Sequence, residues 1–196
     1  MPILRIQPIS YSGKRLPELG ERVLRALYPR IDDFVIRPGI QYEAAYQASG
    51  DKSDPPASLP SVGPDFLDYL ARYGRFVLGI TSLPAIRNQY GDWLFGQARP
   101  SVQVAYVSSS RPPFKALDSD EHVERLSIEA IHEAGHIFGL NDHYRVDKKT
   151  RSGKRCPMTR AHASDARRGV ITWEDYISSR DFVFCPECCG SLASPG

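Results

Sequence analysis

The chain reads H-E-A-G-H-I-F-G-L-N-D-H from His132 to His143, and this stretch is the most informative part of the sequence. His132 and His136 are four residues apart, so on a helix they project from one face, about one turn apart. Two imidazoles placed in this way can share one divalent metal ion. Gly139 can adopt a positive φ without steric cost, which lets the helix end and the chain turn sharply. We therefore predict a metal site in which this turn brings back His143 as the third ligand.

The residue types favour zinc with an open coordination position. Imidazole suits zinc, and three histidine ligands leave one tetrahedral position for water, as in catalytic rather than structural sites. Glu133 adjoins the first ligand and is the expected proton acceptor for that water. We interpret the stretch as the zinc-peptidase signature H-E-x-x-H-x-x-G-x-x-H, with His143 as its last histidine.

The residues before the signature predict a long helix. Ser119 or Asp120 can cap its amino end, and neither glycine nor proline interrupts the run that leads into the motif. Apolar residues recur at helical spacing and predict a buried stripe. The expected helix runs from about residue 120 to 140, with His122 as a solvated surface residue.

The four cysteines predict a second metal site. They are Cys156, Cys185, Cys188 and Cys189. Cys185 and Cys188 form a C-x-x-C knuckle, whose spacing lets both thiolates bind one zinc ion, and Cys156 is a third ligand across a loop. In a reducing compartment such a cluster favours metal binding over a disulfide, although buried free thiols or a disulfide remain alternatives.

The fourth ligand of this second site stays open. Cys189 adjoins Cys188, and adjacent cysteines rarely reach one tetrahedral ion without strain. The other candidates are His162, Asp147 and water.

Length and composition fit one compact domain. The chain has 196 residues, of which 41% are hydrophobic, and a net charge of +2, which argues against a dedicated nucleic-acid binder. No apolar run reaches the 18 or so residues of a membrane helix, and the amino terminus lacks a secretory apolar region. We expect a cytoplasmic monomer that acts on peptides or proteins and contacts neither membrane nor nucleic acid.

Apolar patterning predicts an α/β (α+β) fold with a mixed, twisted sheet backed by helices. We expect strands at residues 3–9, 33–37, 75–81, 93–96 and 101–107, and helices at 16–28 and 65–73. The strand at 101–107 is a candidate for the sheet edge along which an extended peptide adds. Residues 1–140 are expected to form an amino-terminal subdomain that ends in the active-site helix. Residues 141–196 form a small carboxy-terminal subdomain with little regular structure.

Met158 is a candidate for a structural role beneath the metal. It follows Cys156-Pro157 and would occupy the tight turn that underlies the zinc in metzincin peptidases. Its side chain would give the imidazoles a hydrophobic floor, and Gly139 supports the same site by allowing the turn.

At this point the sequence resembles the archaemetzincins, also called archaelysins. The similarity rests on the extended histidine motif, Cys156-Pro157-Met158 and Phe184-Cys185-Pro186-Glu187-Cys188. It extends to Ile6-Gln7-Pro8 and Phe76-Val77-Leu78-Gly79-Ile80-Thr81. The resemblance implies a compact metzincin-type zinc peptidase with a second, cysteine-bound zinc beside the active site. In that family a cysteine commonly follows the third histidine as a ligand of the structural zinc. We assign that position to Tyr144, so the second site departs from the family, and Cys189 is an extra cysteine.

Two other functions compete with a peptidase. A zinc-binding protein without turnover would retain the metal ligands, but it would have no need of Glu133. A zinc-knuckle module could contact nucleic acid through the basic residues of 145–155, but that stretch lacks aromatic side chains for stacking.

Overall fold

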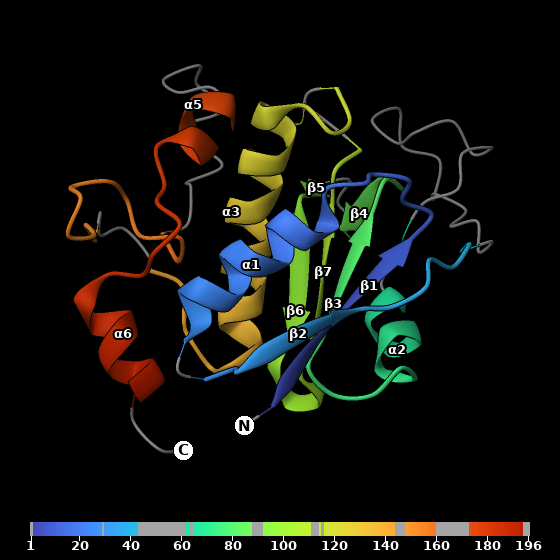
Figure 1. Ribbon diagram of the computed structural model, residues 1–196, viewed down its shortest axis with the longest axis horizontal. Helices are drawn as coiled ribbons and strands as arrows, with labels where there is room; N and C mark the ends of the chain where they lie inside the picture. Colours follow the sequence, from blue (N-terminus) through green and yellow to red (C-terminus); the bar gives the residue numbers. More distant parts are fainter. Residues whose placement is uncertain are drawn as a thin grey trace.

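The computed structural model describes residues 2–28, 30–42, 62, 65–87, 92–110, 114, 116–143, 148–159 and 173–193. Its centre is a five-stranded sheet with the order β2-β1-β3-β7-β6 (Figure 1). The strands are β1 (Ile3–Ile9), β2 (Asp33–Ile36), β3 (Val77–Thr81), β6 (Gly96–Arg99) and β7 (Val104–Ser108). The first four strands in this order are parallel, and β6 pairs antiparallel with β7. The predicted mixed sheet is confirmed.

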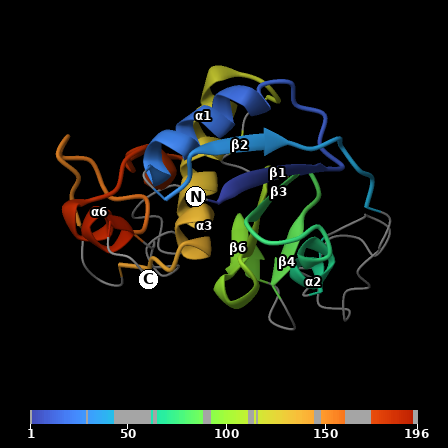
Figure 2. The ribbon, with the colours of Figure 1, turned by 60° about the horizontal axis from the view of Figure 1, so that its bottom comes forward.

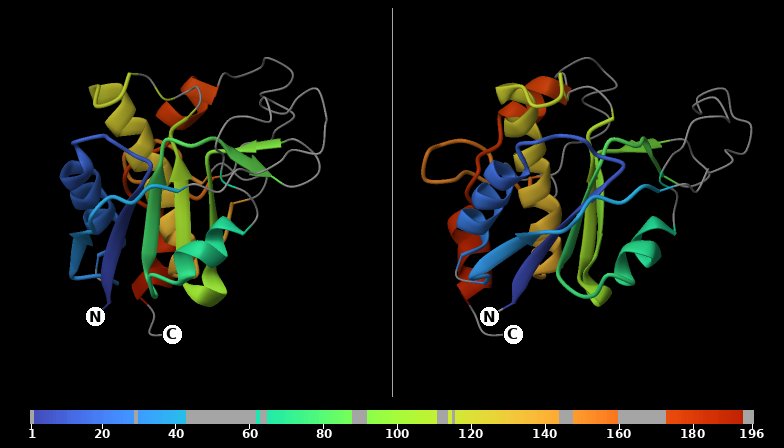
Figure 3. Two further views of the ribbon diagram at one scale, coloured as in Figure 1. Left: turned by 90° about the vertical axis from the view of Figure 1, so that its right-hand side faces the viewer. Right: turned by 45° about the vertical axis from the view of Figure 1, so that its right-hand side comes forward.

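Helices cover both faces of the sheet. α1 (Leu16–Leu27) and α3 (Asp120–Ile137) lie on one face, and α2 (Phe66–Ala71) lies on the other (Figure 3). The central strand β3 and its neighbour β7 are buried at every position, as strands covered on both faces require. Along β3, Leu78 and Ile80 pack in the cluster shared with α1 and α3, whereas Val77 packs with α2. This alternation fixes the register of the sheet between the two helical layers.

Short elements complete the amino-terminal part. β4 (Ala85–Arg87) and β5 (Asp92–Leu94) form a separate antiparallel pair, and a 3₁₀ turn, η2 (Pro100–Val102), connects β6 to β7. β6 is the last strand at its end of the sheet in the described part of the chain. The prediction that residues 101–107 form the edge is wrong, because β7 lies between β3 and β6 and hydrogen-bonds on both sides.

α3 begins where the sequence predicts and buries more of its length than expected. Ser119 caps it, since its side chain accepts a hydrogen bond of 3.1 Å from the backbone N–H of His122. His122 was expected at the surface, but its side chain is buried and its Nε2 lies 3.1 Å from the hydroxyl of Tyr11. Its ring also packs edge-on against Phe114. The loops that precede α1 and α3 therefore close over this histidine.

The carboxy-terminal segment contains helices where little regular structure was expected. These are α5 (Trp173–Ser178) and α6 (Pro186–Ala193). α6 starts with a proline, which is favourable in the first helical turn, and buries Cys188 and Leu192 on one face. It lies beside α3, on the side of the molecule away from α2 (Figure 2).

Across the residues that the structure describes, every helix is too short or too polar to traverse a bilayer.

Candidate active site

The active-site helix and the turn after it bring together His132, His136 and Asp142. One nitrogen or oxygen atom from each side chain lies within 4.8 Å of the others. Oδ1 of Asp142 is 3.3 Å from Nε2 of His136 and 3.6 Å from Nε2 of His132. We call these three residues the His–Asp site.

Hydrogen bonds orient both imidazoles toward the centre of the His–Asp site. Nδ1 of His132 lies 2.9 Å from the carbonyl oxygen of Pro157, and Nδ1 of His136 lies 2.8 Å from that of Leu140. A carbonyl oxygen can only accept, so each Nδ1 carries a proton, and in the neutral ring Nε2 keeps its lone pair free to bind a metal ion. This is the tautomer that a metal-binding histidine requires.

Burial and neighbouring charges tune these groups differently. Burial, with the positive charge of Arg180, lowers the pKa of His132 to about 3, so this ring is neutral near pH 7. Burial also lowers the pKa of His136, but the hydrogen bond and charge of Asp142 outweigh it and the net shift is upward. Asp142 thus faces both rings and favours the protonated form of His136.

A turn at Gly139 ends α3, and the chain after it is extended, so Asp142 and His143 point to different sides. Gly139 has a φ of 86°, and the N–H of Leu140 returns to the carbonyl of Gly135 at 3.0 Å. Such a positive φ is strained for other residues, so the predicted turn depends on glycine at this position. Beyond it the chain is extended at His143, which forms a bridge with Thr159.

The structure corrects the placement of His143. In the signature, the last ligand stands three residues after the glycine, and this position is Asp142; His143 is the fourth residue after Gly139. Side chains of consecutive residues in an extended segment point to opposite sides. The ring of His143 therefore faces away from His132 and His136, and the residue in the third-ligand position is an aspartate.

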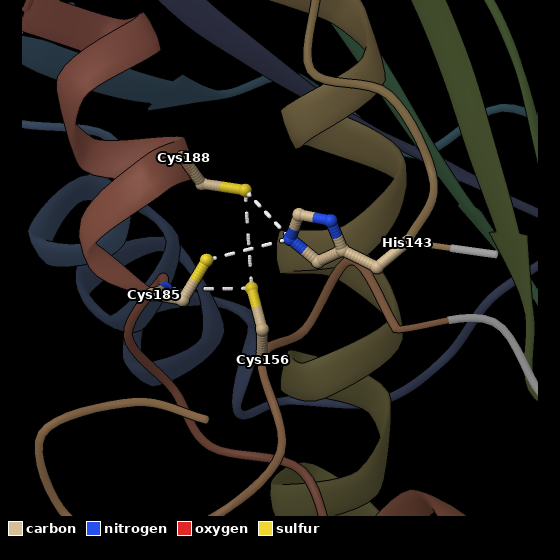
Figure 4. A group of neighbouring side chains, drawn as sticks. All are labelled: His143, Cys156, Cys185 and Cys188. Atoms are coloured by element: carbon tan, nitrogen blue, oxygen red, sulfur yellow. Dashed lines mark hydrogen bonds between the residues drawn. The ribbon is translucent and has the colours of Figure 1, made fainter. Parts of the chain in front are cut away.

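His143 instead joins three cysteines, as Figure 4 shows. Its Nε2 lies 3.2 Å from Sγ of Cys188 and 3.4 Å from Sγ of Cys185, and Sγ of Cys156 is 3.9 Å from that of Cys188. All three thiols are buried. We call these four residues the Cys–His site.

The fourth member of the Cys–His site also corrects the sequence analysis. The residue that directly follows the third-ligand position is His143 and not Tyr144, so the expected departure at Tyr144 does not arise. Cys189 is exposed, and its Sγ approaches the carbonyl of Phe184 at 3.5 Å rather than the other thiols. Tyr144 and the alternative ligands Asp147 and His162 lie outside the described residues.

Glu133 and Met158 flank the His–Asp site. Glu133 is buried, and burial raises its pKa to about 8; its Oε1 lies 3.9 Å from Nε2 of His132. Met158 is fully buried beneath α3, where a Cβ on Gly135 would come within 2.7 Å of its Sδ. Its carbonyl accepts a hydrogen bond of 2.8 Å from the N–H of His143.

Two functional candidates had escaped the sequence analysis. Asp142 could have been found by counting residues from Gly139. Arg180, which is buried behind His132, carries no local signal, because its surroundings come from segments distant in the sequence.

Known proteins are similar to this chain in sequence and in fold. No family model matches the chain. The archaemetzincin of Thermococcus kodakarensis is 24% identical over 203 aligned residues, which cover 96% of this chain and 94% of the relative.

Solved structures are similar over nearly the whole length. The archaemetzincin of Archaeoglobus fulgidus, crystallised with malonate, is 20% identical with a TM-score of 0.65, covering 97% of this chain and 99% of its own. The archaemetzincin of Methanopyrus kandleri is 21% identical with a TM-score of 0.63, and the match covers 96% of this chain and 93% of that one. A zinc-dependent peptidase of Methanocorpusculum labreanum is 19% identical with a TM-score of 0.64, and the match covers 97% of this chain and 100% of that one. The chain therefore has the fold of the archaemetzincins, and the resemblance that its motifs indicated is confirmed.

Proposed function

We propose that this protein is a zinc-dependent peptidase. The observation that carries the proposal is the convergence of His132, His136 and Asp142 in one site, with the buried carboxyl group of Glu133 beside it. The names of the similar proteins, archaemetzincins and a zinc-dependent peptidase, support the same function.

The donor atoms of the His–Asp site fit zinc. Two neutral imidazole nitrogens and one carboxylate oxygen are ligands that catalytic zinc accepts, and three protein ligands leave a coordination position open. The carbonyl oxygens of Pro157 and Leu140 hold both rings in the metal-binding tautomer. Zinc bound there would supply Lewis acidity that polarises a peptide carbonyl and activates water.

Glu133 is the proposed general base and then general acid. Its neighbour His132 places it at the edge of the metal site, and its burial keeps bulk water away from the carboxyl group. The positive charge of a bound metal would favour the ionised form of Glu133, which takes the proton of the attacking water and passes that proton to the departing amine. A protein that only stored or bound zinc would gain nothing from a buried carboxyl group at this position, which argues against the alternative without turnover.

The edge strand β6 is the proposed place for the substrate. It is the last strand at its end of the described sheet, and its first residue, Gly96, lies against the side chain of Glu133. A peptide that pairs with β6 as an added strand would run past Glu133 and gain main-chain hydrogen bonds. Binding of this kind demands little of the peptide's side chains.

The Cys–His site is the proposed structural zinc site. Three thiolates and one imidazole complete a closed tetrahedral set that leaves no position for substrate. The fourth ligand, which the sequence left open, is in this proposal His143.

Cleavage of a proteome-derived peptide library tests the proposal. We expect the unmodified protein to create new termini that mass spectrometry detects, and Glu133→Gln to cut about 10²–10⁴ times more slowly, because it lacks the proton acceptor. Glu124→Gln on the same helix is the matched control and should cut normally. Equal cutting by the Glu133→Gln variant would contradict the role of Glu133. If the protein has zinc in both sites and still makes no cuts, the alternative without turnover would replace the proposal.

A further inference from the structure

Arg180 is the only arginine or lysine that is buried among the residues that the structure describes, with 2% of its surface exposed. A buried guanidinium group is costly unless charged and polar partners compensate it. Arg180 lies after α5, far in sequence from the metal-binding helix. The contacts of its guanidinium group therefore indicate the role of this buried side chain.

The guanidinium group links three segments. It forms a buried ion pair with Glu129 of α3, and its Nη1 donates a hydrogen bond of 3.2 Å to the carbonyl of Pro157. Its plane also lies over the ring of Tyr176, 5.0 Å from the ring centroid. Arg180 thus ties α5 and the Cys156–Met158 segment to the active-site helix.

Both polar partners of Arg180, the Pro157 carbonyl and Glu129, are close to His132 in space or along α3. The carbonyl of Pro157 that accepts from Arg180 also accepts from Nδ1 of His132, at 2.9 Å. Glu129 lies three residues before His132 and four before Glu133, on the same side of α3. Arg180 therefore fixes the carbonyl that sets the tautomer of His132 and also fixes the helix that carries the ring.

We propose that Arg180 is a positioning residue that holds the Pro157 carbonyl against His132 and so sets the metal affinity of the His–Asp site. This inference rests on the proposed function only in assigning His132 to a bound metal. Arginine is suited to the task, because its planar fork directs separate N–H groups at Glu129 and at Pro157. Lysine would keep the charge, but its compact ammonium group lacks the planar fork that reaches Glu129 and Pro157 in two fixed directions.

Cobalt and zinc titrations of the full chain test the proposal. The variants are Arg180→Met, Arg180→Lys and the double variant Glu129→Leu/Arg180→Met, with Arg22→Met as the matched control in a partly exposed ion pair with Glu18. Cobalt bound by thiolates has a near-ultraviolet charge-transfer band that cobalt at the His–Asp site lacks, so the two sites are followed separately. Zinc affinity is measured by competition with a chelator, and stability by denaturant unfolding.

We expect Arg180→Met and Arg180→Lys to bind metal at the His–Asp site about 10–100-fold more weakly, as is typical when a group that orients a ligand is lost. Affinity at the Cys–His site should stay within about twofold. The double variant should recover stability, because it leaves no unpaired buried charge, but it should not recover metal affinity. Arg22→Met should resemble the unmodified protein.

Two results would overturn the proposal. Unchanged affinity of the His–Asp site in both Arg180→Met, which cannot donate to Pro157, and Arg180→Lys, which keeps the charge, would show that the Pro157 contact is dispensable. Recovery of affinity together with stability in the double variant would reduce Arg180 to a stabilising ion pair. If the unmodified protein binds no metal at the His–Asp site, the proposed function itself fails, and this result is distinct from any effect of Arg180.

Discussion

At the scale of single residues, the most informative pair is Asp142 and His143. They are adjacent in the chain, yet each faces a different cluster, because the backbone is extended after the turn at Gly139. A carboxylate in the third position brings a negative charge to the His–Asp site that a third imidazole would not. An imidazole in the Cys–His site correspondingly reduces its negative charge relative to four thiolates.

The role of Asp142 can be tested by removing its charge. We expect Asp142→Asn to lower zinc affinity at the His–Asp site by more than about tenfold, because an amide is a weaker ligand than a carboxylate. Asp142→His should keep the metal, because it supplies an imidazole at the same position. Metal content after dialysis against a chelator measures both effects, and Asp68→Asn, at an exposed ion pair, is the control. Retention of the metal by Asp142→Asn would exclude Asp142 as a ligand.

At the scale of secondary-structure elements, the close approach of α3 and β6 shapes the site. A Cβ on Gly96 would lie 2.6 Å from Cγ of Glu133 and 2.7 Å from the carbonyl oxygen of Tyr106. The second of these atoms is backbone and cannot rotate away. Only glycine therefore lets the edge strand run this close to the proposed general base.

This close approach predicts a selective defect in Gly96→Ala. We expect the added methyl group to displace Glu133 or β6, lowering kcat/KM at least tenfold while both metals stay bound. Gly39→Ala is the matched control, because its nearest neighbour, Cβ of Pro8, would be 3.9 Å away. Peptide cleavage rates and metal content distinguish the outcomes. Normal turnover by Gly96→Ala would mean that β6 and Glu133 accommodate the added methyl group without loss of activity.

At the scale of the whole molecule, two chain segments connect the metal sites. The Asp142–His143 segment contributes one residue to each site. In the Cys156–Met158 segment, Cys156 belongs to the Cys–His site, while the Pro157 carbonyl supports His132 of the other site. The Cys–His site thus shares the Asp142–His143 and Cys156–Met158 segments with the His–Asp site.

Loss of the Cys–His site should therefore affect the other site as well. We expect Cys188→Ser to lose one metal, weaken metal binding at the His–Asp site and unfold at a lower temperature. Free zinc at about 100 times its Kd contributes about 2.7 kcal/mol. For a chain of this size that corresponds to a decrease in Tm of about 5–10 °C.

The exposed Cys189 provides the control for this prediction. Cys189→Ser should keep both metals and its Tm, because its side chain lies outside the Cys–His site. Calorimetry and metal analysis of the two serine variants give the comparison. Full affinity of the His–Asp site in Cys188→Ser would show that the two sites are independent.

Local patterns were enough to predict most of the elements. The apolar spacing of 16–28 and the alternation of 3–9 predicted α1 and β1, and the capping residues Ser119 or Asp120 predicted the start of α3. The spacing of His132 and His136 likewise placed both rings on one side of that helix. Each of these features depends on residues within a few positions of one another, so the sequence is sufficient to specify it.

Tertiary structure decided the features that depend on distant segments. His122 is buried because the loop at Tyr11 closes over it, and β7 is internal because β6 pairs along its outer side. The directions of Asp142 and His143 follow from the turn at Gly139 and from the pairing of His143 with Thr159. Arg180 reaches Glu129 and Pro157 only in the folded chain. The sequence by itself thus determined the helix, its two histidines and, by the count from Gly139, the third position at Asp142. Packing between distant segments decided that His143 and Cys156 meet the cysteine knuckle and that Arg180 supports His132.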